Sequence, residues 1–228
     1  MSNNGQAQWA DPNPAGNLLV ACILLGTGGL FAGFVPAGCL PLLLVNSIII
    51  GLTLLMIAVI SFKRGDIMGG TLNAVFGTIF GVGSSLAGLV QFVLPIFLGV
   101  VTKGPATVPV AQIPGHVNGM VLLPGAVAML VMAVVAVRLS WLLASWFGVF
   151  SIALGSASIW LLLGSPGVSD PLRPIENGLI NTSGWLFIMC GVSMFYIGVA
   201  NLIDTLAGKV VLPLGSPIIK PAPGPDAS

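Results

Sequence analysis

Six apolar stretches, each about as long as a membrane-crossing helix, follow one another along this chain with only short polar segments between them. A helix needs about 20 apolar residues to cross the roughly 30 Å hydrocarbon core of a bilayer. Charged residues make up 6% of the 228 residues, against about a quarter in a soluble domain. The chain is therefore predicted to be an all-α membrane protein with six transmembrane helices in a compact bundle.

Charges, prolines and glycine clusters set the limits of the six predicted spans. A charged side chain is costly in lipid and a proline interrupts a helix, so each span ends where these residues gather. The predicted spans cover residues 18–34, 42–62, 69–94, 119–137, 140–163 and 183–203. They form a transmembrane domain, 18–207, between a polar N-terminal segment, 1–17, and a proline-rich tail, 208–228.

The basic residues predict the orientation of the bundle, because Lys and Arg are retained preferentially on the cytoplasmic side of a membrane. One side of the six predicted spans, together with both termini, carries Lys63, Arg64, Arg138, Lys209 and Lys220. The other side carries only Lys103 and Arg173. Both termini are therefore predicted to be cytoplasmic, in a multi-pass protein of the plasma membrane.

Charge and residue types also exclude several classes of function. A net charge of +1 without a basic cluster argues against nucleic acid as a partner, because phosphate binding needs gathered Lys and Arg side chains. The sequence shows neither a metal-ligand spacing nor a nucleophile beside a base. We therefore expect no enzymatic activity, no metal site and no cofactor. The expected partners are the lipid bilayer and a small solute.

Small residues recur at heptad spacing along four of the six spans, in steps of three and four or of seven, as close helix packing in lipid requires. In the third span Asn73, Gly77 and Gly81 begin such a stripe. We interpret the stripes first as packing seams, with a stripe facing a narrow passage as the alternative. An amide in hydrocarbon needs a polar partner, which a water-filled passage supplies. Asn73, Asn46 and Asn201 are therefore candidates for lining a pathway.

Three motifs stand out, one near each end of the chain and one between the second and third spans. The N-terminal motif is Asp11-Pro12-Asn13-Pro14-Ala15-Gly16-Asn17, and the motif between the spans is Lys63-Arg64-Gly65-Asp66. The C-terminal motif comprises Gly184-Trp185, Cys190-Gly191, Ser193, Tyr196, Gly208-Lys209 and Val211-Leu212-Pro213-Leu214-Gly215. These motifs resemble signatures of the acetate uptake transporter family, which comprises bacterial succinate-acetate permeases and fungal acetate permeases.

The resemblance implies a six-helix protomer assembled as a homohexamer, in which each protomer has its own pore for acetate, another short monocarboxylate or succinate. It places an entrance motif of Asp11, Pro12, Pro14 and Gly16 at the mouth of the pore. A hydrophobic constriction would close the middle of that pore. The constriction and substrate pathway would together comprise Val20, Phe76, Phe147, Asn73, Asn46, Tyr196 and Asn201.

Several positions depart from the pattern of that family. Asp11 stands for the first Asn of its opening signature, and Val20 stands in the place of an aromatic residue. Leu54 and Ser61 replace a Gln and a Glu of the second helix, and Asn201 replaces a Glu of the last. The smaller Val20 predicts a wider constriction. These departures concern the substrate more than the fold.

Three functions are compatible with the sequence. The first is a carboxylate permease in which the protonated acid carries its own proton, so that uptake increases as the external pH falls. The second is a channel for urea or short amides, like the six-helix hexamers of the amide/urea channel family, which lack both end motifs. The third is a non-transporting membrane subunit. In that case, substitution of Phe76 or Asn73 would change oligomer stability and leave solute flux at background.

Overall fold

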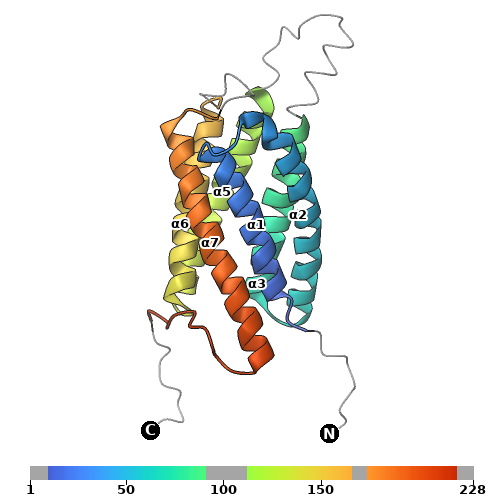
Figure 1. Cartoon of the computed structure of the whole chain (residues 1–228), viewed down its shortest axis with the longest axis vertical. Coiled ribbons are helices and arrows are strands. Elements are labelled where there is room, and N and C mark those ends of the chain that lie inside the picture. The colour runs from blue at the N-terminus through green and yellow to red at the C-terminus, as the bar shows by residue number, and fades with distance from the viewer. Residues whose placement is uncertain (1–9, 91–111, 166–173, 220–228) are drawn as a thin grey trace, which may run out of the picture.

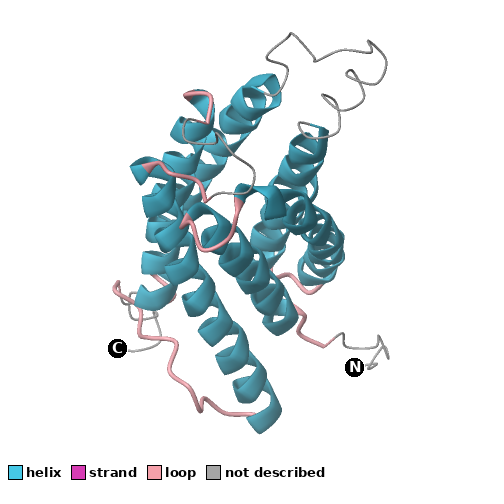
Figure 2. Cartoon of the chain, turned by 45° about the horizontal axis from the view of Figure 1, so that its top comes forward, coloured by secondary structure: helices cyan, strands magenta, loops and turns pink. Residues whose placement is uncertain are grey.

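The computed structural model describes residues 10–90, 112–165 and 174–219, and the regular structure within these ranges is entirely helical (Figures 1 and 2). Within them lie six segments that are long and apolar enough to cross a membrane. They are Asn13–Phe31, Ala37–Lys63, Ile67–Val90, His116–Ala136, Trp141–Leu162 and Gly178–Ala207. The prediction of an all-α protein with six membrane-spanning helices is confirmed.

The elements follow one another as single helices joined by short turns. In chain order they are α1 (Asn13–Phe31), the 3-10 turn η1 (Ala37–Cys39), α2 (Leu40–Lys63), α3 (Ile67–Val75), the π-helix η2 (Phe76–Gly83), α5 (Gln112–Ala136), α6 (Trp141–Leu162) and α7 (Gly178–Ala207). Residues 84–90 continue the third span as α-helix.

The helices pack as three pairs joined into one bundle. α1 lies along α7, α5 lies along α6, and α2 packs against α3 and η2. Contacts of α6 with α7 and of α1 with α2 join these pairs around a shared hydrophobic core. The start of α1 and the end of α7 lie at the same end of the bundle (Figure 1), as an even number of crossings requires.

Capping explains why two helices begin earlier than predicted. Pro12 is the N-cap of α1 and Pro14 lies in its first turn, where a missing N–H costs nothing and the fixed φ suits a helix. The N-terminal motif therefore forms the first turn of α1, which begins at Asn13 and not at residue 18. α7 begins before residue 183 because Asn177 Oδ1 accepts hydrogen bonds from the backbone N–H groups of Leu179 (3.0 Å) and Ile180 (3.4 Å).

Other boundaries also differ from the prediction. α5 begins at Gln112, ahead of the predicted residue 119, because Pro114 falls in the first turn of a helix, where proline is tolerated. α7 spans 30 residues, about 45 Å at 1.5 Å per residue, and ends at Gly208 with a left-handed φ of 64°. The predicted end of the third span at residue 94 lies outside the described residues. Residues 208–219 contain no helix.

Glycines allow two helix pairs to approach each other closely. A Cβ atom added to Gly28 on α1 would lie 2.9 Å from the carbonyl oxygen of Gly184 on α7. A Cβ atom on Gly51 of α2 would lie 2.7 Å from the Cα atom of Gly81 in η2, and one on Gly77 would lie 2.8 Å from the Gly51 oxygen. The small-residue stripe of the third span is therefore a packing seam against α2, as its first interpretation predicted.

The Gly28 contact generates a stability prediction with a matched control one residue away. In Gly28→Ala the new methyl group would lie 2.8 Å from Ile188 Cγ1 and 2.9 Å from the Ile188 nitrogen, so α1 and α7 must separate. We expect the free energy of unfolding to fall by about 1–3 kcal/mol, measured by thermal unfolding in detergent. Gly29→Ala has no neighbouring atom within 4 Å and is expected to be neutral or slightly stabilising. Equal losses in both variants would contradict this account of the seam.

Candidate functional site

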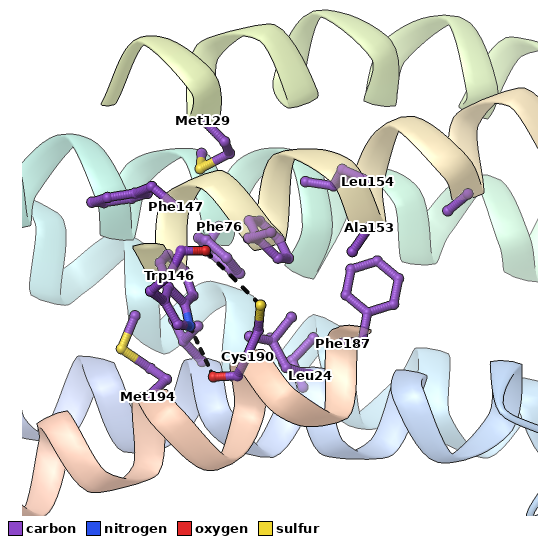
Figure 3. Close-up of a cluster of buried hydrophobic side chains, with 14 of the residues drawn as sticks. Leu24, Phe76, Met129, Trp146, Phe147, Ala153, Leu154, Phe187, Cys190 and Met194 are labelled. Carbon is purple, nitrogen blue, oxygen red and sulfur yellow. Dashed lines mark hydrogen bonds between the residues drawn. The ribbon is translucent and has the colours of Figure 1, made fainter. Parts of the chain in front are cut away.

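Aromatic side chains fill the centre of the bundle. The rings of Phe76 and Phe150 are stacked with centroids 5.1 Å apart, and those of Trp146 and Phe150 are stacked at 5.2 Å. Phe147 meets Trp146 edge-on at 5.0 Å. Figure 3 shows Phe76, Trp146 and Phe147 close together within the hydrophobic cluster. These contacts join η2 to α6, although these elements are far apart in the sequence.

The π-helix η2 contributes two phenylalanines to this aromatic layer. η2 covers Phe76–Gly83 in the middle of the third span, and such wide turns are rare and frequently occur at functional sites. Its two phenylalanines, Phe76 and Phe80, have ring centroids 5.0 Å apart. Ser85 Oγ donates a hydrogen bond to the Phe80 carbonyl oxygen at 3.5 Å, which satisfies one acceptor of the widened turn. The sequence analysis did not predict this segment.

Two cavities extend from the centre toward opposite ends of the bundle. The larger, of about 450 Å³, lies toward η1 and is lined mainly by apolar side chains, including Phe76, Phe150 and Phe187. The smaller, of about 240 Å³, lies toward the start of α1 and is lined by Phe147 together with several polar residues. Phe76 therefore lines one cavity and Phe147 the other.

The three predicted constriction residues are all buried in the core of the bundle. Val20, Phe76 and Phe147 each have 0% of their surface exposed and belong to the same buried cluster. Val20 comes from α1, Phe76 from η2 and Phe147 from α6. The three residues that the family resemblance assigned to one closure are thus core residues from three helices, and their role as a closure stays a prediction.

Polar groups of the N-terminal motif line the smaller cavity. Asn13 Nδ2 donates a hydrogen bond to Asp66 Oδ2 at 2.5 Å, and Ser61 Oγ donates to Asn13 Oδ1 at 3.4 Å. Asp66 is also the N-cap of α3, because its Oδ1 accepts from the Gly69 N–H at 2.9 Å. The amides of Asn17 and Asn201 line the same cavity. The motif therefore ties the first turn of α1 to the turn between α2 and α3.

Gly16 is required by the packing of Asn73 against it. A Cβ atom on Gly16 would lie 2.5 Å from Asn73 Oδ1. Asn73 is 1% exposed and its Nδ2 donates to the Gly69 carbonyl oxygen at 2.8 Å, while its Oδ1 accepts no hydrogen bond. A buried acceptor without a partner is costly, so this amide is held in place by the packing around it.

The tail closes the end of the bundle near the smaller cavity. Ser140 Oγ donates to the Leu214 carbonyl oxygen, and the Trp141 N–H donates to the Ser216 carbonyl oxygen at 3.1 Å. Tyr196 donates its hydroxyl hydrogen bond to the Pro213 carbonyl oxygen at 2.9 Å. Leu214 itself lines the smaller cavity. Residues 208–219 therefore form a strap under the α5–α6 turn, a role that the sequence analysis did not predict.

The structure brings most, but not all, of the predicted pathway residues to the cavities or the buried core of the bundle. Asn73 is buried beside the N-terminal motif and Asn201 lines the smaller cavity. Asn46 is exposed on α2 and lines neither cavity. Tyr196 is 38% exposed and holds the tail instead of lining a cavity. For these two residues the position in the pathway stays a prediction that neither described cavity supports.

The four residues of the predicted entrance motif lie together at the start of α1. Pro14 and Gly16 are buried, and Asp11 and Pro12 are half-buried. Asp11 Oδ1 accepts a hydrogen bond from the Asn13 N–H at 3.1 Å. None of the four lines either cavity, so the contact of this motif with the smaller cavity runs through Asn13 and Asn17.

Sequence reasoning missed Trp146, Phe150 and Phe187 in the aromatic layer and the pair Asn13–Asp66 in the cavity wall. The aromatic residues gave a weak signal, since large apolar side chains occur on every face of these spans. The polar pair gave a better one. Asn13 lies in the N-terminal motif and Asp66 ends the motif Lys63-Arg64-Gly65-Asp66, so each motif supplies one polar side chain able to form the contact.

Comparisons with known proteins support the fold. No protein-family model matches the sequence, and no curated protein sequence does so. Among solved structures, the bacterial acetate channel SatP matches with a TM-score of 0.68 and 18% sequence identity, over 91% of this chain and 100% of that chain. The resemblance read from the sequence motifs is thereby confirmed at the level of the fold.

The Trp146 indole generates a second stability prediction. Its Nε1–H donates to the Cys190 carbonyl oxygen of α7 at 2.8 Å in a fully buried contact, drawn as a dashed line in Figure 3. Trp146→Phe keeps most of the ring packing but leaves that carbonyl without its donor. We expect the free energy of unfolding to fall by about 1–3 kcal/mol. Trp185→Phe, at a ring that is 52% exposed, is the control and is expected to change it by less than about 0.5 kcal/mol.

Proposed function

We propose that this chain is a membrane passage for acetate and other short monocarboxylic acids, serving uptake across the plasma membrane. The observation that carries the proposal is the arrangement of two cavities, directed to opposite ends of the bundle, one lined by Phe76 and the other by Phe147. The likeness in fold to the acetate channel SatP supports the substrate class. Cytoplasmic termini and assembly as a homohexamer complete the proposal, on the basis of the basic-residue distribution and the family resemblance.

The proposed mechanism is passage of a small amphiphile through an apolar layer that hydrated ions do not cross. A closed ring of apolar side chains sheds water and opens transiently to a solute that tolerates dehydration. The protonated acid tolerates this step because it is uncharged, and its fraction rises about tenfold for each pH unit of acidification above its pKa of about 4 to 5. Uptake coupled to protons follows, because each neutral molecule carries its proton with it.

A short neutral amide is the second candidate substrate. The wall of the smaller cavity contains the side chains of Asn13, Asn17, Asn201 and Asp66, whose oxygen atoms accept hydrogen bonds from N–H donors. Urea and acetamide are such donors and are uncharged at every pH of interest. The apolar layer would treat them much as it treats the protonated acid.

The function is tested with the purified full chain in liposomes, using labelled acetate and labelled urea. We expect acetate influx above the rate of empty liposomes, increasing as external pH falls from about 7.5 to about 6, because the neutral acid becomes more abundant. Urea flux that exceeds acetate flux at the lower pH would favour the amide channel. Rates equal to those of empty liposomes for both solutes would contradict transport and favour a structural subunit.

The size of the proposed closure is tested at Val20, which is fully buried in the core of the bundle. Val20→Phe adds a ring to the apolar layer, so we expect acetate influx to fall about tenfold and that of longer acids to fall further. Val131→Phe makes the same change on α5, where the side chain is 58% exposed, and is expected to leave flux unchanged. An unaltered solute size limit in folded Val20→Phe would count against Val20 as part of the closure.

A further inference from the structure

One ionisable side chain lies in the described walls of the two cavities. Among their lining residues, Asp66 in the smaller cavity is the only Asp, Glu, Lys, Arg or His. The larger cavity is lined by apolar residues and by neutral hydroxyl and amide groups such as those of Ser47, Ser85 and Asn118. A solute that crosses the described passage therefore meets a single fixed charge, and that charge is negative.

The position of this carboxylate is fixed by contacts at both of its oxygens. Oδ1 accepts from the Gly69 N–H at the start of α3, and Oδ2 accepts from Asn13 Nδ2 on α1. Acceptance at both oxygens is the pattern of an ionised carboxylate. Because one contact is a helix cap and the other joins two helices, the charge is held at the cavity wall and does not swing out into water.

The neighbouring charges lie on the outer side of the same turn. Lys63 and Arg64 are exposed and line neither cavity. Asp11 precedes α1 and is half-buried, and its Oδ1 accepts a hydrogen bond from the Asn13 N–H. The Asp66 carboxylate is thus the ionised group that a solute inside the cavity approaches most closely.

We propose that Asp66 sets the charge selectivity of the passage, so that the anion is rejected at the smaller cavity and the uncharged form of the substrate is admitted. The inference rests on the proposed function and adds that the transported form of the substrate is the uncharged one. A carboxylate anion in this cavity is repelled by Asp66 in surroundings less polar than water. A protonated carboxyl or an amide instead donates a hydrogen bond to the acceptor oxygens of Asp66 and Asn201.

Acetate and acetamide provide a matched pair of probes, since they have nearly the same size and differ in charge. The full chain is reconstituted in liposomes in potassium buffer with valinomycin, which holds the membrane potential at zero, at about pH 7.5, where acetate is almost entirely anionic. Rates of labelled acetate and acetamide are measured after subtraction of the rates in empty liposomes. The readout is the ratio of acetate flux to acetamide flux.

Asp66→Asn removes the charge and keeps the helix cap, because Asn is also a good N-cap residue and its Oδ1 accepts from the Gly69 N–H. Its Nδ2 takes the place of the oxygen that accepts from Asn13, so the Asn13 amide must turn its oxygen toward it. We expect the acetate-to-acetamide ratio to rise about fivefold or more, equivalent to about 1 kcal/mol. Glu176→Gln removes the same charge at an exposed position that lines neither cavity, and its ratio should match that of the wild type. An unchanged or lower ratio in Asp66→Asn would overturn the proposal.

A second variant tests the same inference in the opposite direction and replaces the first if Asp66→Asn fails to fold. Asn201→Asp adds a carboxylate to the wall of the smaller cavity and should lower the ratio, whereas an unchanged or higher ratio would overturn the proposal. Different results overturn the proposed function and the charge selectivity. A wild-type protein that moves neither solute overturns the proposed function as well. A wild-type protein that moves solute while the variants leave its ratio unchanged overturns the charge selectivity alone.

Discussion

Helices in a bilayer gain little from hydrophobic association, because lipid tails are as apolar as the side chains. The bundle therefore depends on close backbone approach and on hydrogen bonds between helices. Gly28 against Gly184 joins α1 to α7, and Gly51 against Gly81 joins α2 to η2. Buried donors add to these seams: Ser183 Oγ reaches the Ala153 carbonyl oxygen at 2.7 Å between α7 and α6. Because contacts near the helix axes hold the pairs together, large rings can occupy the centre.

The small residues thus serve packing, and the aromatic residues determine the shape of the interior. Where glycine allows α2 and η2 to touch, the phenylalanines of η2 project toward α6 and meet Trp146 and Phe150. The π-helical turn belongs to the same arrangement, since it lies at the level where the two cavities approach each other. A layer built in this way is apolar, and it lies where Phe76 lines the larger cavity and Phe147 lines the smaller one.

The sequence predicted the six spans because the cost of charge in lipid limits each one, as Lys63 and Arg64 limit α2. It did not predict exact helix ends, which depend on local caps such as Asn177 Oδ1. The sequence also contained little indication of which side of each helix faces the interior of the bundle. These spans are apolar on every side, so nothing in the pattern told the exposed Asn46 from the buried Asn73. Val20, Phe76 and Phe147 were identified only through the family resemblance, because no periodicity singles them out.

Two kinds of discrimination are separated along the proposed passage. Asp66 and Asn13 line the smaller cavity, while Phe76 is fully buried in the aromatic layer at the centre of the bundle. A charge within the apolar layer would be costly for the fold, whereas at the cavity wall it is stabilised by a helix cap and an amide. Asp66 therefore lies where the fold tolerates a fixed charge. In the proposed passage, it acts on the charge of the solute before the solute loses its water. Selection by charge and selection by size then act in sequence on a solute entering from that end.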